Sequence, residues 1–138
     1  MEDLEWLSGW ALTHDYDPTW DYEVRFEQRY HPTVQKAQGL IEQISSEHPV
    51  PWQEGRVYPA DLEGPLAVFV SGTNGAPVVL LDLDAHHSTG LEIGLNPDEI
   101  ESAVLDSLIH ELRHAYQEAH DWAMDETEAE HGSARIPF

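Results

Sequence analysis

The chain has 138 residues, of which 27 are acidic and six are basic, so its formal net charge at pH 7 is −21. With so few basic residues, we expect neither direct nucleic-acid binding nor binding to an anionic membrane through a basic patch. Disorder is not expected either, because 41% of the residues are hydrophobic and many recur periodically. The length suits one compact domain, which we take to span residues 1–138.

The sequence contains no cysteine, so any zinc ligands must be His, Asp or Glu. It shows neither a signal-peptide pattern nor an apolar run of the roughly 18 to 20 residues that a membrane-spanning helix needs. We therefore expect a cytoplasmic protein. Lys36 is the only lysine, and acidic residues occur along the whole chain. This composition resembles that of proteins from halophilic cells or their viruses.

The first third of the chain contains an expected arm and an expected helix. Residues 1–20 carry several tryptophans among acidic residues, and we expect an N-terminal arm that packs on the domain through its indole rings. Residues 21–30 fit either a strand or the beginning of a helix. From 32 to about 46 the apolar residues fall on one helical face, and a proline suits the first position. This pattern predicts a one-sided helix.

The middle of the chain favours strands. Two β-type runs, 66–70 and 78–84, flank the turn sequence SGTNGAP and predict a hairpin. The run LEIGL at 91–95 alternates apolar residues with others and predicts a third strand, in which Gly94 marks a bulge or a close backbone approach. His86 and His87, which follow the second hairpin strand, are taken as a solvated turn pair.

A long second helix is predicted to follow. Asn96 suits the N-cap, Pro97 suits the first helical position, and Glu99 can complete a capping box. The apolar positions predict that the helix continues to about Ala119. The expected fold class is α+β: a small three-stranded sheet packed against an N-terminal helix and this long helix, with a short C-terminal helix.

The stretch LIHELRHAYQ within this helix contains the motif HExxH. His110 and His114 are four residues apart, so both imidazoles can bind one zinc ion at about 2.0 Å. On a helical wheel both lie beside the core-facing stripe, which leaves an open coordination position facing a cleft. Glu111 can take a proton from a water that the metal activates for attack on a carbonyl.

The residues HELRHAYQ resemble the active-site helix of the zincin metallopeptidases. The order of predicted elements resembles the minimal gluzincins, including the ImmA/IrrE-like proteases, and some features are similar to the SprT-like proteases. The resemblance implies that His110 and His114 bind Zn²⁺ and that Glu111 is the catalytic base.

The resemblance also implies a third zinc ligand. Gluzincins supply a glutamate from the next helix in the pattern E-x-x-A followed by an acid, and ETEAE at 126–130 matches it. Glu126 is thus the predicted ligand, and Glu130 is implied to hold a ligand histidine. Both roles require the long helix to break near residues 120–124, with Asp125 as the N-cap of a new helix.

Two other residues remain candidates for the third zinc ligand at this point. His120 is spaced as in the metzincins, but Gln117 occupies the place of the glycine that this pattern requires. His131, followed by Gly132, resembles the distal His-Gly of the SprT-like proteases. The residue that would stabilise the oxyanion is also open, with candidates Tyr58, Tyr116 and Arg135.

The predicted function is that of a zinc-dependent metallopeptidase, a hydrolase whose partner is a peptide or protein substrate. The resemblance to the zincins implies that the substrate pairs with an edge strand of the sheet, either LEIGL or the second hairpin strand. The alternative is a non-catalytic acidic binding module, either with a structural zinc or of the DNA-mimic type. Glu111 discriminates between the two, because a structural zinc needs no base.

The acidic composition predicts salt-dependent stability. We expect the melting temperature to rise from about 0.1 M salt to several molar, because the Debye length falls from about 10 Å to about 3 Å at 1 M and screens the self-repulsion. Thermal unfolding followed by circular dichroism across this range checks the prediction. An unchanged melting temperature would count against adaptation to high salt.

Overall fold

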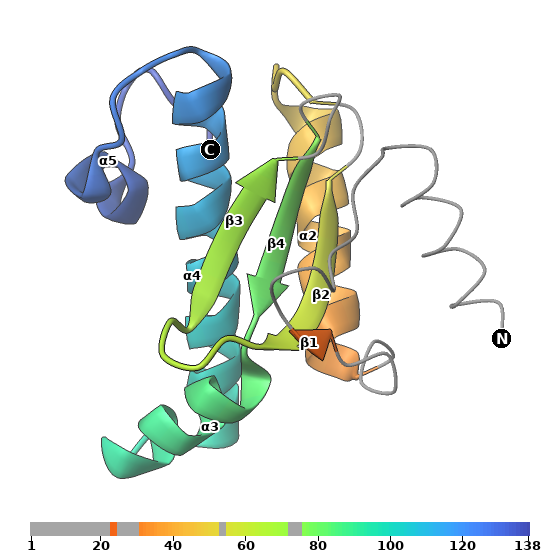
Figure 1. The fold of residues 1–138 in the computed structure, drawn as a ribbon, viewed down its shortest axis with the longest axis vertical. Helices are drawn as coiled ribbons and strands as arrows, with labels where there is room; N and C mark the ends of the chain where they lie inside the picture. Colours follow the sequence, from red (N-terminus) through yellow and green to blue (C-terminus); the bar gives the residue numbers. More distant parts are fainter. Residues whose placement is uncertain (1–22, 25–30, 53–54, 72–75) are drawn as a thin grey trace, which may run out of the picture.

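The computed structural model describes residues 23–24, 31–52, 55–71 and 76–138. The arm predicted for residues 1–20 lies outside them, as does most of the segment 21–30. The elements follow in the order β1 (Glu23–Val24), α2 (Pro32–Glu47), β2 (Arg56–Asp61), β3 (Ala67–Ser71), β4 (Pro77–Leu81), α3 (Leu83–Glu92), α4 (Pro97–Ala119) and α5 (Glu126–His131) (Figure 1). The α+β class is confirmed, with a small sheet, the two main helices and a short C-terminal helix.

The sheet has the strand order β1-β2-β4-β3. The central strand β4 is parallel to β2, with Val57 opposite Val79, and antiparallel to β3, with Phe69 opposite Val79. The two-residue strand β1 pairs with the end of β2. The predicted hairpin is confirmed as the pair β3 and β4, and β4 lies between two strands that precede it in the chain.

Helices α2 and α4 lie side by side against one face of the sheet (Figure 1). Successive residues of a strand point to opposite faces. Val79 and Leu81 accordingly pack in the core cluster with the helices, whereas Val78 and Leu80 join a second cluster on the other face. Both faces of β4 are buried, which explains why its sequence, PVVLL, is apolar at every position.

Helix α4 begins as predicted. The Asn96 side chain accepts a hydrogen bond from the backbone N–H of Glu99 at 2.9 Å, and the Glu99 carboxylate accepts one from the backbone N–H of Asn96 at 3.0 Å. This capping box satisfies two donors that the helix end would otherwise leave free. The predicted core stripe is confirmed at Val104, Leu108 and Leu112, which are buried.

The strand predicted at 91–95 is wrong, because this segment ends helix α3. Gly94 has φ +82° and donates to the carbonyl of Leu91, while Leu95 donates to the carbonyl of Gly90. These two bonds form a Schellman motif, in which glycine occupies the left-handed position after the helix. The alternating pattern was misleading, since the Ile93 side chain, predicted to face inward, is 68% exposed.

The third main strand is β2, which is not among the strands predicted from the sequence. Pro59 lies within it, opposite Leu81 of β4, and proline inside a strand argues against a strand prediction. Val57, Tyr58 and Ala60 are nevertheless buried, so β2 contributes to the core despite its proline.

The prediction of two solvated histidines after the hairpin is wrong for His86. His87 is exposed, but His86 is buried on α3 and contacts α4. Its Nδ1 donates to the carbonyl oxygen of Asp82 at 2.9 Å, so its Nε2 accepts from the hydroxyl of Ser107 at 2.8 Å. Burial lowers the pKa of His86, and the neutral ring ties α3 to the middle of α4.

None of the helices in the described part of the chain is long and apolar enough to cross a membrane.

Substitutions of two glycines test whether Gly94 ends α3 in the left-handed conformation. Gly94 has a positive φ, whereas Gly39 lies inside a helix. Gly94→Ala should lower the free energy of unfolding by about 1–2 kcal/mol, because a Cβ disfavours the left-handed conformation. Gly39, an exposed residue inside α2 with no atom near its Cβ position, is the matched control. Gly39→Ala should raise the free energy by about 0.5–1 kcal/mol. Urea unfolding of both variants measures these changes, and equal effects would contradict the assignment.

Candidate metal centre

Helix α4 presents the three motif residues beside its core-facing stripe, as predicted. His110 and Glu111 are half-buried, and His114 is buried. The two imidazole rings are one helical turn apart, with ring centroids separated by 4.9 Å and an interplanar angle of 71°. A capped helix packed on the sheet therefore holds two imidazoles close together.

The chain reverses direction directly after α4, so the predicted break is confirmed. Trp122 donates to the carbonyl of Gln117 at 2.9 Å, and Asp121 donates to the carbonyl of Glu118 at 3.0 Å. These bonds form a second Schellman motif, with Asp121 at φ +57° in the left-handed position. Aspartate enters this conformation more readily than most residues, so the helix ends without glycine or proline.

Helix α5 begins at Glu126 because Asp125 caps it, as predicted. The Asp125 side chain accepts from the backbone N–H of Glu128 at 3.0 Å. The Glu128 side chain does not complete a capping box but turns toward Gln117. The reversal and the cap together bring the first residue of α5 back over α4.

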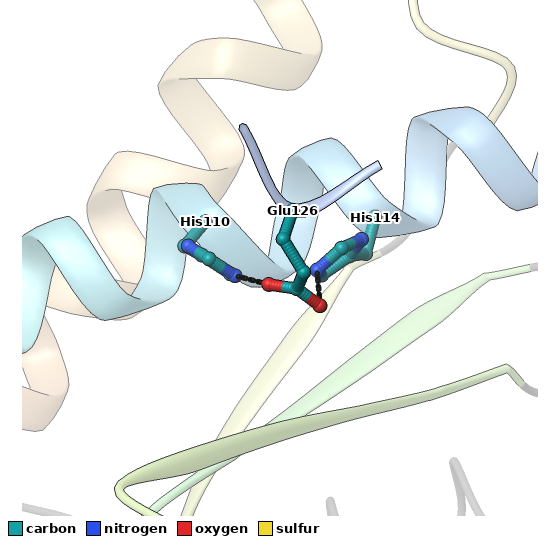
Figure 2. A group of neighbouring side chains, drawn as sticks. All are labelled: His110, His114 and Glu126. Atoms are coloured by element: carbon teal, nitrogen blue, oxygen red, sulfur yellow. Dashed lines mark hydrogen bonds and ion pairs between the residues drawn. The ribbon is translucent and has the colours of Figure 1, made fainter. Parts of the chain in front are cut away.

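Glu126 lies between the two histidines (Figure 2). Its Oε2 is 3.0 Å from His110 Nε2, and its Oε1 is 3.1 Å from His114 Nε2. One ligand atom from each residue lies within 4.8 Å of the others, so this group can hold a metal ion. Of the candidate third ligands, the structure brings Glu126 into the group.

The hydrogen-bond pattern of His114 fits a metal ion. Its Nδ1 lies 2.9 Å from Gln117 Oε1, and its Nε2 faces the Glu126 carboxylate. If both nitrogens donated, this buried ring would carry a positive charge. A metal ion between Nε2 and the carboxylate supplies that charge instead and leaves a neutral imidazole, which is the form that binds metals.

The two histidines that competed for the third position have other contacts. His120 donates from Nδ1 to the carbonyl of Tyr116 at 2.9 Å, and its ring stacks on the Tyr116 ring with centroids 4.3 Å apart. His131, at the end of α5, is exposed and lines a cavity. The metal-binding group contains neither of them among its members.

The partner of a ligand histidine is Gln117, not Glu130 as predicted. Glu130 is exposed, and its backbone carbonyl accepts a hydrogen bond from Arg113. Gln117, which entered the sequence analysis only as a departure from the metzincin pattern, is 0% exposed because α5 folds over it.

Glu128 connects Gln117 to the C-terminal segment. Its carboxylate accepts from Arg135 Nε at 2.6 Å and from the Ser133 hydroxyl at 2.6 Å. These contacts lower the pKa of Glu128 to about 2, with the Arg135 hydrogen bond as the largest cause. The Arg135 guanidinium also lies over the Trp122 ring, 3.8 Å from its centroid, and so braces the reversal.

The three oxyanion candidates are engaged elsewhere. Arg135 is paired with Glu128, and Tyr116 packs edge-on against Trp52 in the main core. Tyr58 is buried in the second core cluster, on the sheet face opposite the helices. No assignment of an oxyanion residue follows from these positions.

A cavity of about 800 Å³ adjoins His110 and Glu111. It lies between the beginning of β3, the middle of α4 and the end of α5, with lining residues that include Leu66, Ala67, His110, Glu111 and His131. Burial raises the pKa of Glu111, although His114 and His110 oppose this effect. The motif glutamate therefore combines a raised pKa with a position at the cavity wall.

Comparisons with known proteins do not assign this chain to a family. No protein-family model, curated protein or solved structure matches this chain. The resemblance to the zincins stays a prediction that depends on the motif and its surroundings.

The metal-binding group predicts stabilisation by a divalent ion. Added Zn²⁺ or Co²⁺ should raise the free energy of unfolding by about 2.7 kcal/mol at a hundred times the dissociation constant, because the ion binds only the folded arrangement. Glu126→Ala should lose most of this effect. The control Glu42→Ala, which removes an exposed acid from α2, should keep it. Equal stabilisation of the two variants, measured calorimetrically, would exclude Glu126 as a ligand.

Proposed function

We propose that this protein is a zinc-dependent metallopeptidase of the gluzincin type. The observation that carries the proposal is the convergence of His110, His114 and Glu126, with Glu111 at the adjoining cavity. Two imidazoles and a carboxylate are ligands that suit zinc, and three protein ligands leave a coordination position for a reacting molecule. The chain's lack of cysteine agrees with such a donor set.

Zinc held by His110, His114 and Glu126 would supply Lewis-acid activation of the peptide carbonyl and of water. Glu111 would accept a proton from the attacking water and donate it to the departing amine. The half-buried position of Glu111 at the cavity suits this role, since a base must reach the reacting water while bulk solvent is restricted.

The cavity also suggests how a substrate binds. Neither strand predicted to pair with the substrate is suitable, because LEIGL is not a strand and β4 is the central strand of its sheet. Strand β3 is instead the edge of the described sheet on the side of α4, and its first residue, Ala67, lines the cavity. An extended peptide can add to this edge by backbone hydrogen bonds. The net charge of −21 favours substrates that carry positive charge.

The acidic binding module remains the second candidate, because a carboxylate between two histidines also suits a structural metal. A structural zinc site has four protein ligands, whereas the group found among the described residues has three.

The acidic composition of the chain supports a high-salt cytoplasm, in a halophilic cell or its virus, as the place where the protein acts.

The decisive comparison is between the wild type and Glu111→Gln, assayed in high salt with a library of quenched fluorescent peptides. The variant should keep its bound zinc but lose about 10²- to 10⁴-fold in kcat, because a general base contributes about that much. Glu42→Gln, which removes one exposed charge from α2, is the control and should keep wild-type activity.

Two results would contradict the proposal. Unchanged activity in Glu111→Gln would show that this residue is not the base. A wild-type protein that binds one zinc but cleaves no peptide would favour the binding module.

A further inference from the structure

We propose that Gln117 is a positioning residue that sets the tautomer of His114 and locks α5, with its ligand Glu126, against α4. This inference rests on the proposed function in that it assigns Gln117 a role at the same metal centre. It concerns a side chain that the HExxH motif does not include.

Every hydrogen-bonding position of the buried Gln117 amide is used. Its Oε1 lies 2.9 Å from His114 Nδ1 and accepts from the backbone N–H of Asp125 at 3.3 Å. Its Nε2 donates to the backbone carbonyl of Asp125 at 3.1 Å and to Glu128 Oε1 at 2.9 Å. An amide has two donors and two acceptor lone pairs, so no capacity is left over.

The direction of this amide follows from Glu128. The Glu128 carboxylate is paired with Arg135 through both of its oxygens, at 2.6 Å and 2.9 Å, and can only accept hydrogen bonds. The NH₂ group of Gln117 must therefore face Glu128, which turns its oxygen toward His114. His114 Nδ1 must then carry a proton, and its Nε2 is directed at the metal position.

The same amide controls the third ligand. Its oxygen and its NH₂ group both bind the backbone of Asp125, the residue directly before Glu126. The Glu126 side chain is 77% exposed, so its place follows from the backbone of α5. Gln117 holds that backbone at Asp125, and Arg113 holds it at Ala129 and Glu130. One buried side chain on α4 thus orients a ligand of its own helix and also positions the ligand from the next helix.

The test replaces Gln117 with methionine, which has a similar length but cannot form these hydrogen bonds. Gln117→Met should bind zinc about 10- to 100-fold more weakly, the usual effect of removing the hydrogen-bond partner of a ligand histidine. It should also lose the protected Nδ1–H of His114, observed by ¹H–¹⁵N NMR of the imidazole ring. The NMR measurement is made on both metal-free and zinc-loaded protein.

Gln38→Met is the matched control. The Gln38 side chain also bridges two elements by hydrogen bonds to the backbone, but it joins α2 to β2. It accepts from the Val57 N–H at 3.0 Å and donates to the Gly55 carbonyl at 3.1 Å. This variant should lower the melting temperature while leaving zinc affinity and the His114 resonance unchanged. A general loss of stability is thereby separated from positioning.

A second variant, Glu128→Gln, tests the direction of the amide with little change in shape. It weakens the charged acceptor of the Gln117 NH₂ group, which the Asp125 carbonyl then holds alone, so zinc affinity and the His114 Nδ1–H signal should both decrease. It also decides the matter if Gln117→Met does not fold. Wild-type zinc affinity and an unchanged Nδ1–H signal in either folded variant would overturn the inference. If the wild type binds no zinc, the proposed function fails, and the NMR signal of metal-free protein still decides the role of Gln117.

Discussion

The candidate metal centre depends on a reversal of chain direction between the end of α4 and the first residue of α5. On one continuous helix Glu126 would lie about 18 Å along the axis from His114, at about 1.5 Å per residue. The left-handed Asp121 ends α4, and the buried amide of Gln117 holds Asp125 against the helix. The third donor reaches the histidines because these local contacts replace further helical turns.

A reversal of this kind can position a ligand only if the helix beneath it is rigid. Helix α4 has that support along its length, from the capping box at Asn96 to the buried residues that face the sheet. The ring of His86 joins it to α3, and the guanidinium of Arg135 braces the reversal against Trp122 and Glu128. The fold thus places the half-buried His110 and Glu111 at an open cavity and the buried His114 beside the packed core.

The parts predicted from the sequence are those with a local physical signal. The cap at Asn96 and the acid at Asp125 marked both helix starts, because such caps need only neighbouring residues. Strand β2 was not predicted, because Pro59 argues against a strand. Helix α3 was not predicted, because residues 91–95 alternate like a strand, although Gly94 ends the helix there. The role of Gln117 depends on α5 folding back over it, so no pattern within α4 could reveal its burial.

We propose that two histidines of α4 and one carboxylate of α5 bind the same ion. X-ray absorption at the zinc edge of the loaded protein, compared with that of Glu126→Ala, tests this ligand set. We expect two imidazole nitrogens at about 2.0 Å and a carboxylate oxygen at about 2.0–2.2 Å, with the carboxylate missing in the variant. A shell of three imidazoles, or a shell that Glu126→Ala leaves unchanged, would contradict it.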